Sequence, residues 1–458
     1  MEEFATVELN DARLNQRCQA LAAKLAQQPQ ASINQASEDW QDTKAAYRFF
    51  QNKRVSAAQI LAPHVQRTVA RLSQQETVLA IQDTTFFNYS HHPKTRGLGL
   101  ISNKKQNQHG LGLHSTLVTT PDGLALGVLT QQFFLRAAAG VAHEPHELRK
   151  LPIEQKESYK WLAAFEQTIR LTPAGVQVVT VCDREGDIYE MFALAQGQAA
   201  ALLVRASSDR RLADEATAKL WAQVGRQPLA GTLLVAIPAR DNQPARQAVV
   251  QVRFTTLTLQ PPWRPRQQKL PRVTLQAVWV KEENPPDHVT EPIEWLLLTN
   301  LPVHCLADAT QVIGYYCTRW QIEVYHKVLK SGCQVEDCRL QTADRLQNYI
   351  ALMSVIAWRL HWLTYINRTA PALPCTVILT TVEWQTLYRY THKTLSLPLS
   401  PPTVHQAVRW LARLGGFLGR QHDREPGVTV IWRGWQRLQD MAATWYLVNE
   451  HSQLVGNS

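Results

Sequence analysis

The feature of this 458-residue sequence that most constrains its fold is a change in the spacing of apolar residues near residue 77. Before that point, apolar residues recur at the three- and four-residue intervals of one helix face: Leu14, Cys18, Leu21, Ala22 and Leu25. After it, short apolar runs alternate with helical stretches. We therefore expect a small helical domain, residues 1–72 with Ser56 as a helix cap, followed by a mixed α/β core.

Apolar runs of strand length define the expected core, residues 73–368. They are residues 77–81, 112–119, 124–130, 176–181, 201–204 and 295–299. Helices are expected at about 154–170, from 187, and over 308–330 and 346–363.

Two further segments differ in texture from the core. Residues 206–293 alternate apolar and polar positions between Pro-rich turns, which predicts an inserted antiparallel β subdomain. Residues 369–458 regain a helical pattern at 404–414 and 435–447, which predicts a C-terminal helical domain.

Composition narrows the class of protein without deciding it. Apolar residues make up 45% of the chain and charged residues 19%, as in a folded protein, and no apolar run is long enough to cross a membrane. The seven cysteines are scattered and form no C-x-x-C pair, so neither a disulfide framework nor a zinc ribbon is indicated. The formal charge of +10 weakly favours a polyanionic partner.

Residues 240–272 concentrate positive charge within the insertion. They contain seven cations and a single acid, Asp241: Arg240, Arg246, Arg253, Arg264, Arg266, Lys269 and Arg272. Charge that protects exposed strand edges is one explanation, but the excess favours contact with phosphates.

Asp83 and Asp183 each follow an apolar run that would lie inside a sheet. A carboxylate at a strand end is rigidly held while its oxygens reach solvent, which suits a hard cation such as Mg²⁺. A turn or helix-capping role is the alternative for either aspartate alone. The nearby acids Glu185 and Asp187 are expected to cap and orient the following helix.

Residues 316–330 carry an amphipathic stripe in which one acid lies among bases. At about 100° per residue, one helix face carries Tyr316, Arg319, Glu323, Lys327 and Lys330, and the opposite face carries Ile322, Tyr325, Val328 and Leu329. A solvated face would usually alternate charges and would not include a tyrosine. We interpret the glutamate as a metal ligand and the surrounding residues as phosphate contacts.

The stripe also resembles a known signature. Tyr316, Arg319, Glu323 and Lys330 match the Y-(2)-R-(3)-E-(6)-K pattern of DDE transposases of the insertion-sequence-four family, the family of the Tn-five transposase. Similar segments occur in the expected order at 44–49, 82–85, 181–188, 294–299 and 412–417. The resemblance spans most of the chain.

This resemblance implies a fold and a chemistry. The fold would be a ribonuclease-H-like mixed sheet with an antiparallel β insertion, flanked by N-terminal DNA-binding and C-terminal dimerisation helices. Asp83, Asp183 and Glu323 would hold two Mg²⁺ ions, for which Mn²⁺ could substitute. The enzyme would cut double-stranded DNA at transposon-end inverted repeats, pass through a hairpin, and join the 3′-OH ends to target DNA.

The resemblance also implies DNA contacts and a setting. Trp295 would stack on a flipped base, although the residue pattern alone favours a buried strand aromatic. Phosphates would be held by Arg205, Tyr316, Arg319 and Lys330, with Lys327 and Arg339 as additional contacts. A homodimer would pair two ends in a synaptic complex in the bacterial cytoplasm, at the nucleoid and away from membranes.

Two alternatives remain open from the sequence. One is a ribonuclease-H-like metal nuclease that cuts without joining, and the other is a domesticated DNA-binding regulator. The intact carboxylates and the complete stripe favour the enzyme.

Overall fold

The computed structural model describes residues 2–102, 106–136, 151–198, 200–213, 218–237, 245–263, 269–287, 289, 291–420, 423 and 425–455, with side chains described as far as residue 448. Among these residues, no helix combines the length and the apolarity needed to span a lipid bilayer.

The N-terminal segment is helical, as its apolar spacing predicts. After a short 3-10 turn η1 (Glu2–Phe4), it contains α1 (Ala12–Gln27), α2 (Ile33–Ala36), α3 (Trp40–Gln51) and α4 (Ala57–Leu72). Ser56 caps α4 as expected, and its side chain forms a reciprocal capping box with Gln59.

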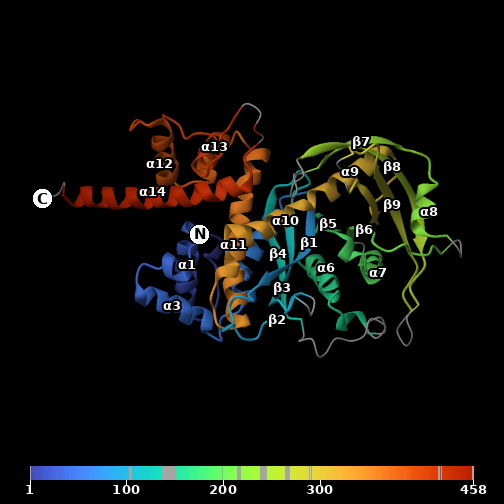
Figure 1. The fold of residues 1–458 in the computed structure, drawn as a ribbon, viewed down its shortest axis with the longest axis horizontal. Helices are drawn as coiled ribbons and strands as arrows, with labels where there is room; N and C mark the ends of the chain where they lie inside the picture. Colours follow the sequence, from blue (N-terminus) through green and yellow to red (C-terminus); the bar gives the residue numbers. More distant parts are fainter. Residues whose placement is uncertain are drawn as a thin grey trace.

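One mixed sheet organises the middle of the molecule (Figure 1). The described strands are β1 (Thr77–Asn88), β2 (Gly99–Leu100), β3 (His109–Thr119), β4 (Ala125–Phe134), β5 (Gln177–Cys182), β6 (Ala201–Arg205), β7 (Gly231–Ile237), β8 (Arg246–Leu259), β9 (Val273–Glu282) and β10 (Glu294–Thr299). Their order is β2-β3-β1-β5-β6-β10-β9-β8-β7, and β4 pairs with β3. Only the central strands β1, β5 and β6 run parallel among the described pairs.

Helices cover both faces of this sheet. One face packs against α6 (Tyr159–Leu171) and α7 (Tyr189–Gln198), whose side chains share a hydrophobic cluster with Cys182 and Leu202. The other face, including Leu79 and Ile81, belongs to a larger cluster that reaches the N-terminal and C-terminal helices. A shared core of this kind ties the terminal helical regions to the face of the sheet that carries Asp83.

The insertion is an antiparallel β segment, as predicted, and its strands continue the main sheet. β9 pairs antiparallel with β10, for example Trp295 with Val280, and β8 and β7 follow outward. Without a neighbour on this side, β10 would leave its backbone N–H and C=O groups unpaired at the sheet edge. β9, which also alternates apolar and polar residues, forms hydrogen bonds with these groups. A short helix, α8 (Leu220–Gly225), also lies within the insertion and was not expected.

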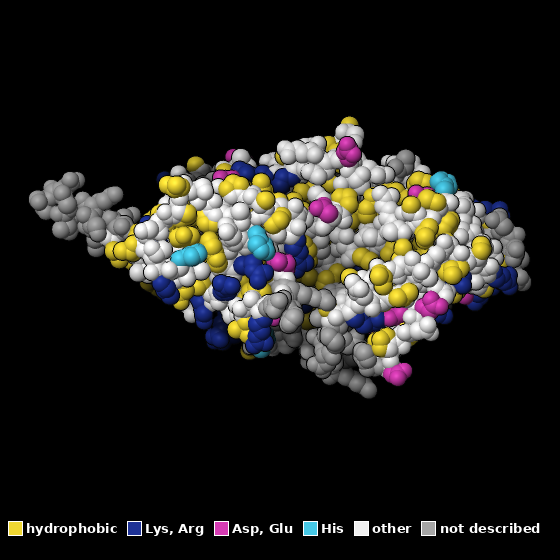
Figure 2. All heavy atoms as spheres, turned by 90° about the horizontal axis from the view of Figure 1, so that it is seen from above, with side chains coloured by type: hydrophobic (Ala, Val, Ile, Leu, Met, Phe, Trp, Pro, Cys, Tyr) yellow, Lys and Arg dark blue, Asp and Glu magenta, His cyan; other side chains and the backbone are white. Residues whose placement is uncertain are grey.

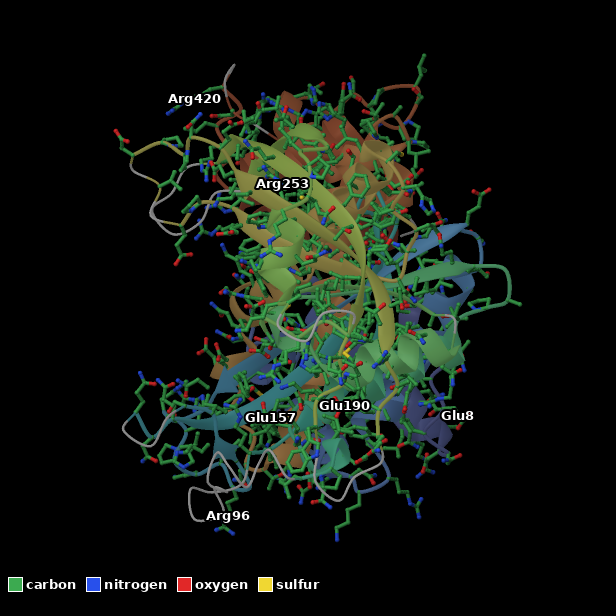
Figure 3. All side chains as sticks on the ribbon, turned by 90° about the vertical axis from the view of Figure 1, so that its right-hand side faces the viewer. Glu8, Arg96, Glu157, Glu190, Arg253 and Arg420 are labelled. Carbon is green, nitrogen blue, oxygen red and sulfur yellow. The ribbon has the colours of Figure 1, made fainter. Side chains whose placement is uncertain are left out.

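The described arginines of the insertion are partly engaged within the protein. Arg246 forms an ion pair with Glu282. The guanidinium of Arg253 donates to the carbonyl oxygen of Gln227 and lies 5.7 Å from the ring centroid of Trp279, on the insertion sheet (Figure 3). These two contacts weaken the predicted role in phosphate binding. Arg240, Arg264 and Arg266 lie outside the described residues.

The segment expected as one helix over 308–330 is interrupted twice. It consists of α9 (Leu306–Thr318), α10 (Trp320–Lys327) and a π-helical turn, η4 (Val328–Gly332). A 3-10 turn, η5 (Val335–Asp337), then leads to the long helix α11 (Ala343–Thr369). Insertions of the π type are frequent at functional sites, and this one carries Lys330.

The C-terminal region is helical, as predicted, but contains one more helix than expected. Beyond the 3-10 turn η6 (Cys375–Val377), it comprises α12 (Thr381–His392), α13 (Val404–Leu414) and α14 (Val428–Val455). The helix α12 begins at a capping box of Thr380 and Glu383. Figure 1 shows α14 extending away from the core toward the C-terminus.

The surface is hollowed between the C-terminal helices and the insertion. In the view from above, a recess separates the part that carries α12–α14 from the part that carries β7–β9 (Figure 2).

Candidate active site

Strand register brings Asp83 and Asp183 together. β1 and β5 are parallel neighbours in which Thr77 lies beside Gln177 and Ile81 beside Val181. Two residues further along come Asp83, still within β1, and Asp183, directly after the last residue of β5. Side chains alternate along a strand, so Asp83 shares the face of Ile81, on which α10 packs against β1, and Asp183 is near enough for Asp83 to raise its pKa.

Asp83 is largely enclosed, and its carboxylate contacts a histidine. His326 Nδ1 of α10 lies 3.5 Å from Asp83 Oδ2, and the Asp83 side chain is 18% exposed. Burial raises the pKa of Asp83, but the neighbouring His326 and Arg319 more than offset this effect, so the pKa lies below its usual value. Asp83 is therefore held as a carboxylate.

His326 is the neighbour that sequence reasoning missed. A histidine fits a magnesium site poorly as a direct ligand, so no sequence pattern indicated that His326 belongs to the site. The signal that was available is its position three residues after Glu323, one helical turn away. Its Nε2 atom is buried and has no hydrogen-bond partner among the described residues.

Asp183 lies in a different electrostatic environment. Burial raises the pKa of its carboxyl, a hydrogen bond from the backbone N–H of Glu185 lowers it, and the negative Asp83 raises it again, with a net upward shift. The two partly buried carboxylates repel each other, and Arg319, which lowers the pKa of both, compensates their charge only in part. The donor set consists of oxygens, so the pair suits a hard divalent cation.

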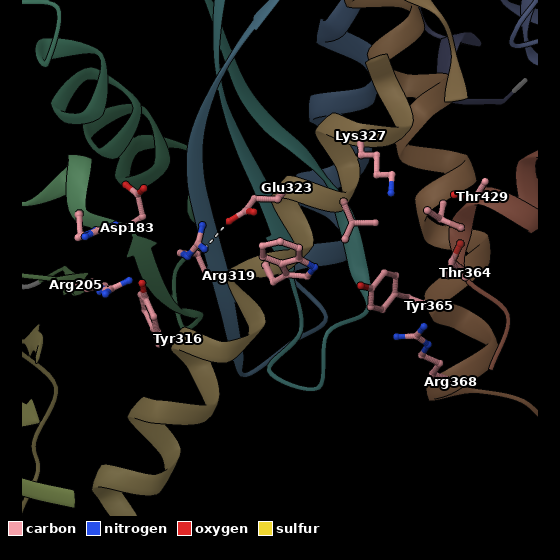
Figure 4. A pocket seen from close by; sticks show the side chains of 15 residues that line it. Asp183, Arg205, Tyr316, Arg319, Glu323, Lys327, Thr364, Tyr365, Arg368 and Thr429 are labelled. Atoms are coloured by element: carbon pink, nitrogen blue, oxygen red, sulfur yellow. Dashed lines mark hydrogen bonds and ion pairs between the residues drawn. The ribbon is translucent and has the colours of Figure 1, made fainter. Parts of the chain in front are cut away.

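Glu323 faces the aspartates from α10, but it is engaged by a cation of the protein. Arg319 Nη2 lies 2.5 Å from Glu323 Oε1 (Figure 4). Within the described residues, no three side chains of metal-binding type are already placed to hold an ion. Arg319 thus holds one carboxylate oxygen of Glu323 in this structure.

Tyr316, Trp295 and Arg205 form one side of the site. The rings of Trp295 and Tyr316 meet edge to face with centroids 5.1 Å apart. Arg205, at the end of β6, donates to the carbonyl oxygen of Glu294 and lies near Tyr316. Trp295 is thus partly packed against Tyr316, intermediate between a buried aromatic and a freely exposed one.

The other three residues predicted to contact DNA, Lys327, Lys330 and Arg339, differ in their exposure and in their position relative to the acids. Lys327 is exposed at the end of α10, on the far side of Glu323 from Tyr316 (Figure 4). Lys330 is half-buried with its ammonium 5.8 Å from the ring centroid of Phe87, and burial lowers its pKa. Arg339 is exposed between η5 and α11 and does not line the cavity at the acids.

The sequence predicted that Asp187 caps the helix that follows it, but in the structure its carboxylate is bound elsewhere. Its carboxylate accepts hydrogen bonds from the backbone N–H groups of Ser207 and Ser208 at 2.8 Å and forms an ion pair with Arg210. It therefore anchors the segment after β6. Glu185 is exposed beside Asp183, and burial and Asp183 raise its pKa.

A cavity of about 970 Å³ opens at the acids. Asp183, Arg205, Tyr316, Arg319 and Glu323 line it, and the cavity continues to α11 and to the start of α14. Asp83 lies within β1 and not at its end as predicted, because the strand continues to Asn88, whereas Asp183 directly follows β5. Acids beside a positively charged wall are an arrangement suited to binding metal and a phosphodiester together.

Comparison with protein families agrees with this arrangement. Residues 1–55 match the transposase DNA-binding family, residues 224–360 the transposase DDE domain, and residues 355–448 the Tn5 transposase dimerisation domain. The DDE match contains Glu323, whereas Asp83 and Asp183 precede it.

The mixed sheet and the DDE match define a ribonuclease-H-like enzyme that cuts and joins DNA and depends on divalent metal. The chain is a DDE transposase related to the Tn5 transposase, consistent with the insertion-sequence-four family. It binds DNA and forms a homodimer.

Proposed function

We propose that Asp83, Asp183 and Glu323 are the catalytic carboxylates of a cut-and-paste transposase and together hold two Mg²⁺ ions, with Mn²⁺ able to substitute. The observation that carries this proposal is the register of β1 and β5, which aligns the two aspartates on the face covered by α10, the helix of Glu323. Bound cations would activate the attacking oxygen and stabilise the leaving oxygen of each displacement.

The chain's own residues would hold the DNA for this chemistry. Arg319 and Tyr316 lie beside the acids and are suited to bind the phosphates around the scissile bond. Arg205 and Lys330 would hold neighbouring phosphates, and Trp295 would stack on a base displaced from the duplex. Transfer of Arg319 from Glu323 to a phosphate would free the glutamate, so DNA binding would complete the site.

The proposed route is a series of in-line displacements at phosphorus. Water first cuts one strand at the transposon end, and the freed 3′-OH attacks the opposite strand to give a hairpin. In that step one P–O bond forms as another breaks, so no external energy source is required. Water then opens the hairpin, and the same 3′-OH attacks target DNA.

We also propose that three regions of the chain have separate roles. Residues 1–72 would bind the terminal inverted repeats, residues 73–368, with the 206–293 insertion, would form the catalytic core, and residues 369–458 would mediate dimerisation in the synaptic complex. The enzyme would act at the bacterial nucleoid in the cytoplasm.

The test uses alanine variants of the three acids on an oligonucleotide duplex that carries the transposon end. Each variant is expected to lose nicking by at least about 10³-fold in Mg²⁺ while it binds the end with near wild-type affinity. Glu185→Ala, which removes the exposed acid beside Asp183, is the matched control and should still nick. A variant of Asp83, Asp183 or Glu323 that nicks normally would exclude that residue.

Two further readouts separate the finer steps. Denaturing gels of wild-type reactions should show hairpin ends of the excised fragment, and linear ends alone would exclude the hairpin route. Pre-cut ends should join to a supercoiled plasmid; failure of joining with normal nicking would favour a nuclease that does not transfer strands.

A further inference from the structure

The cavity at the proposed catalytic acids extends past Glu323, on the side away from Tyr316 and Arg205. From Glu323, its wall continues along residues that we term the C-terminal arm: Lys327 of α10, Thr364, Tyr365 and Arg368 of α11, and Thr429 of α14. Figure 4 shows this arm and the side formed by Asp183, Arg205 and Tyr316 on opposite sides of Glu323. The acids thus lie between two differently built walls of one cavity.

The chemistry of the C-terminal arm suits a phosphodiester backbone. It combines two exposed cations, one aromatic ring and the hydroxyl of Thr429, and it contains no acid beyond Glu323 at its inner end. The guanidinium of Arg368 lies 4.9 Å from the ring centroid of Tyr365, within the range of a cation–π contact.

The two cations of the arm also differ from several arginines elsewhere in the molecule. Among the described residues, neither Lys327 nor Arg368 has an ion-pair partner, whereas Arg71, Arg210 and Arg246 pair with nearby acids. Cations that line a concave surface and lack an internal partner attract a polyanion.

The scissile phosphate is a diester, so DNA lies on both sides of the acids. The strand that is cut or joined continues from this phosphate in two directions, through its leaving oxygen and through the bridging oxygen that stays on phosphorus. Under the proposed function, the wall of Arg205, Tyr316 and Trp295 holds the transposon end. The DNA beyond the scissile phosphate must then follow the other wall.

We propose that the C-terminal arm binds the phosphodiester backbone of the DNA that is not transposon. This DNA has two sources with the same chemistry: the flanking donor DNA before excision and the target DNA during joining. The inference rests on the proposed function, because it takes the three acids as the reaction centre. It gives the end of α11 and the start of α14 a role in the cleft besides the dimerisation proposed for the C-terminal region.

The experiment compares the full-length wild-type protein with Arg368→Glu on ends that lack flanking DNA. We expect the variant to bind pre-cut ends within about twofold of wild type and to join them to a plasmid at least about tenfold less, because it loses a phosphate contact and introduces repulsion. Retained end binding also demonstrates that the variant is folded.

Controls and a second substrate sharpen the result. Arg420→Glu makes the same change at an exposed site of the C-terminal region outside the cavity lining (Figure 3) and should join normally. Arg368→Lys should retain most of the joining because it keeps the charge. Transposon ends that carry a 20-base-pair flank of donor DNA then identify which DNA the arm binds. If Arg368→Glu loses the extra affinity that the flank gives to wild type, the arm binds donor DNA as well as target DNA. If the variant retains this extra affinity, the arm binds target DNA alone.

Two results would overturn the proposal. Joining by Arg368→Glu within twofold of wild type, together with unchanged flank affinity, would show that the arm binds neither DNA. A parallel fall in affinity for pre-cut ends would place the transposon end itself in the arm. Failure of the wild-type protein to join pre-cut ends would instead refute the proposed function.

Discussion

At the residue scale, the charge balance around Arg319 determines what the site can do before DNA arrives. Its guanidinium pairs with Glu323 and influences the pKa of both Asp83 and Asp183. The positive charge of Arg319 therefore compensates only part of the negative charge of the three acids. Under the proposed function, a divalent metal held by the acids and a DNA phosphate bound by Arg319 would together complete the charge balance.

His326 is predicted to position Asp83. Its ring contacts the Asp83 carboxylate from a buried site, and partners that orient a metal-binding carboxylate affect metal affinity or activity by about 10- to 100-fold. We expect His326→Ala to raise the Mg²⁺ concentration for half-maximal nicking by about tenfold or more, with end binding unchanged. His326→Gln should be less affected. An unchanged Mg²⁺ requirement in His326→Ala would contradict this role.

Glu3 is predicted to make stability depend on pH. Its carboxylate accepts from His64 Nδ1 at 2.5 Å and from Arg71 at 2.9 Å, and His64 Nε2 accepts from the Val128 N–H, so the imidazole is neutral. Burial raises the pKa of Glu3, but these hydrogen bonds lower it to about 2. The ionised carboxylate thus stabilises the docking of the N-terminal segment onto α4 and β4.

The sign of the pH effect follows from the lowered pKa. The stabilisation is fully present above pH 4.5 and is lost as the pH falls toward 2. Glu3→Gln should cost on the order of 1–3 kcal/mol of unfolding free energy at pH 7, and the difference from wild type should shrink below pH 4.5. Denaturant unfolding across this range measures it. Glu2→Gln, at a 91% exposed side chain, is the control, and a difference independent of pH would refute the account.

Single residues illustrate how far sequence reasoning reached. The Y-R-E-K spacing identified Glu323 as a candidate because the signature is local in sequence. Neither His326 beside Asp83 nor the carboxylate of Asp187 on Ser207 could be predicted, because each contact joins separate elements. Their partners are fixed by tertiary packing and have no local pattern.

At the element scale, the sheet explains how distant acids meet. Strand existence was predictable from apolar runs, and the parallel pairing of β1 and β5 supplies the alignment. The continuation of the sheet through β9 and β10 was not predictable, because alternation shows which face is buried but not which edges pair. The π-helical turn η4 was not predictable either. The side-chain stripe over 316–330 was placed on a regular α-helix, and η4 departs from that helical period.

Close helix packing makes Gly434 sensitive to substitution. A Cβ at Gly434 of α14 would lie 1.8 Å from the carbonyl oxygen of Leu411 in α13, so the backbones must separate. We expect Gly434→Ala to cost about 2–3 kcal/mol or more of unfolding free energy. Gly314→Ala, which meets no atom within 4 Å in α9, should be neutral or stabilising. Equal melting temperatures for the two variants would contradict the packing argument.

At the scale of the whole molecule, dimerisation is predicted to depend on the free end of α14. Leu447 is 65% exposed on a helix that extends from the core (Figure 1). We expect Leu447→Asp to weaken pairing of two DNA ends by about tenfold or more, since an apolar interface would receive a charge. Native gels of end complexes measure this effect.

The control for dimerisation is a matched leucine at the other end of the molecule. Leu234 of β7 is 68% exposed, so Leu234→Asp changes charge equally without touching the C-terminal region. It should leave paired-end complexes intact. Equal loss of pairing in both variants, or none in Leu447→Asp, would argue against α14 as the dimer contact.

The most direct test of the central claim is a crystal structure of the transposase with a pre-cut end and Mn²⁺, using anomalous scattering to locate the metal. The account predicts manganese peaks between Asp83, Asp183 and Glu323, with Arg319 moved from Glu323 to a DNA phosphate. Manganese bound elsewhere, with Glu323 still paired to Arg319 beside correctly bound DNA, would contradict it.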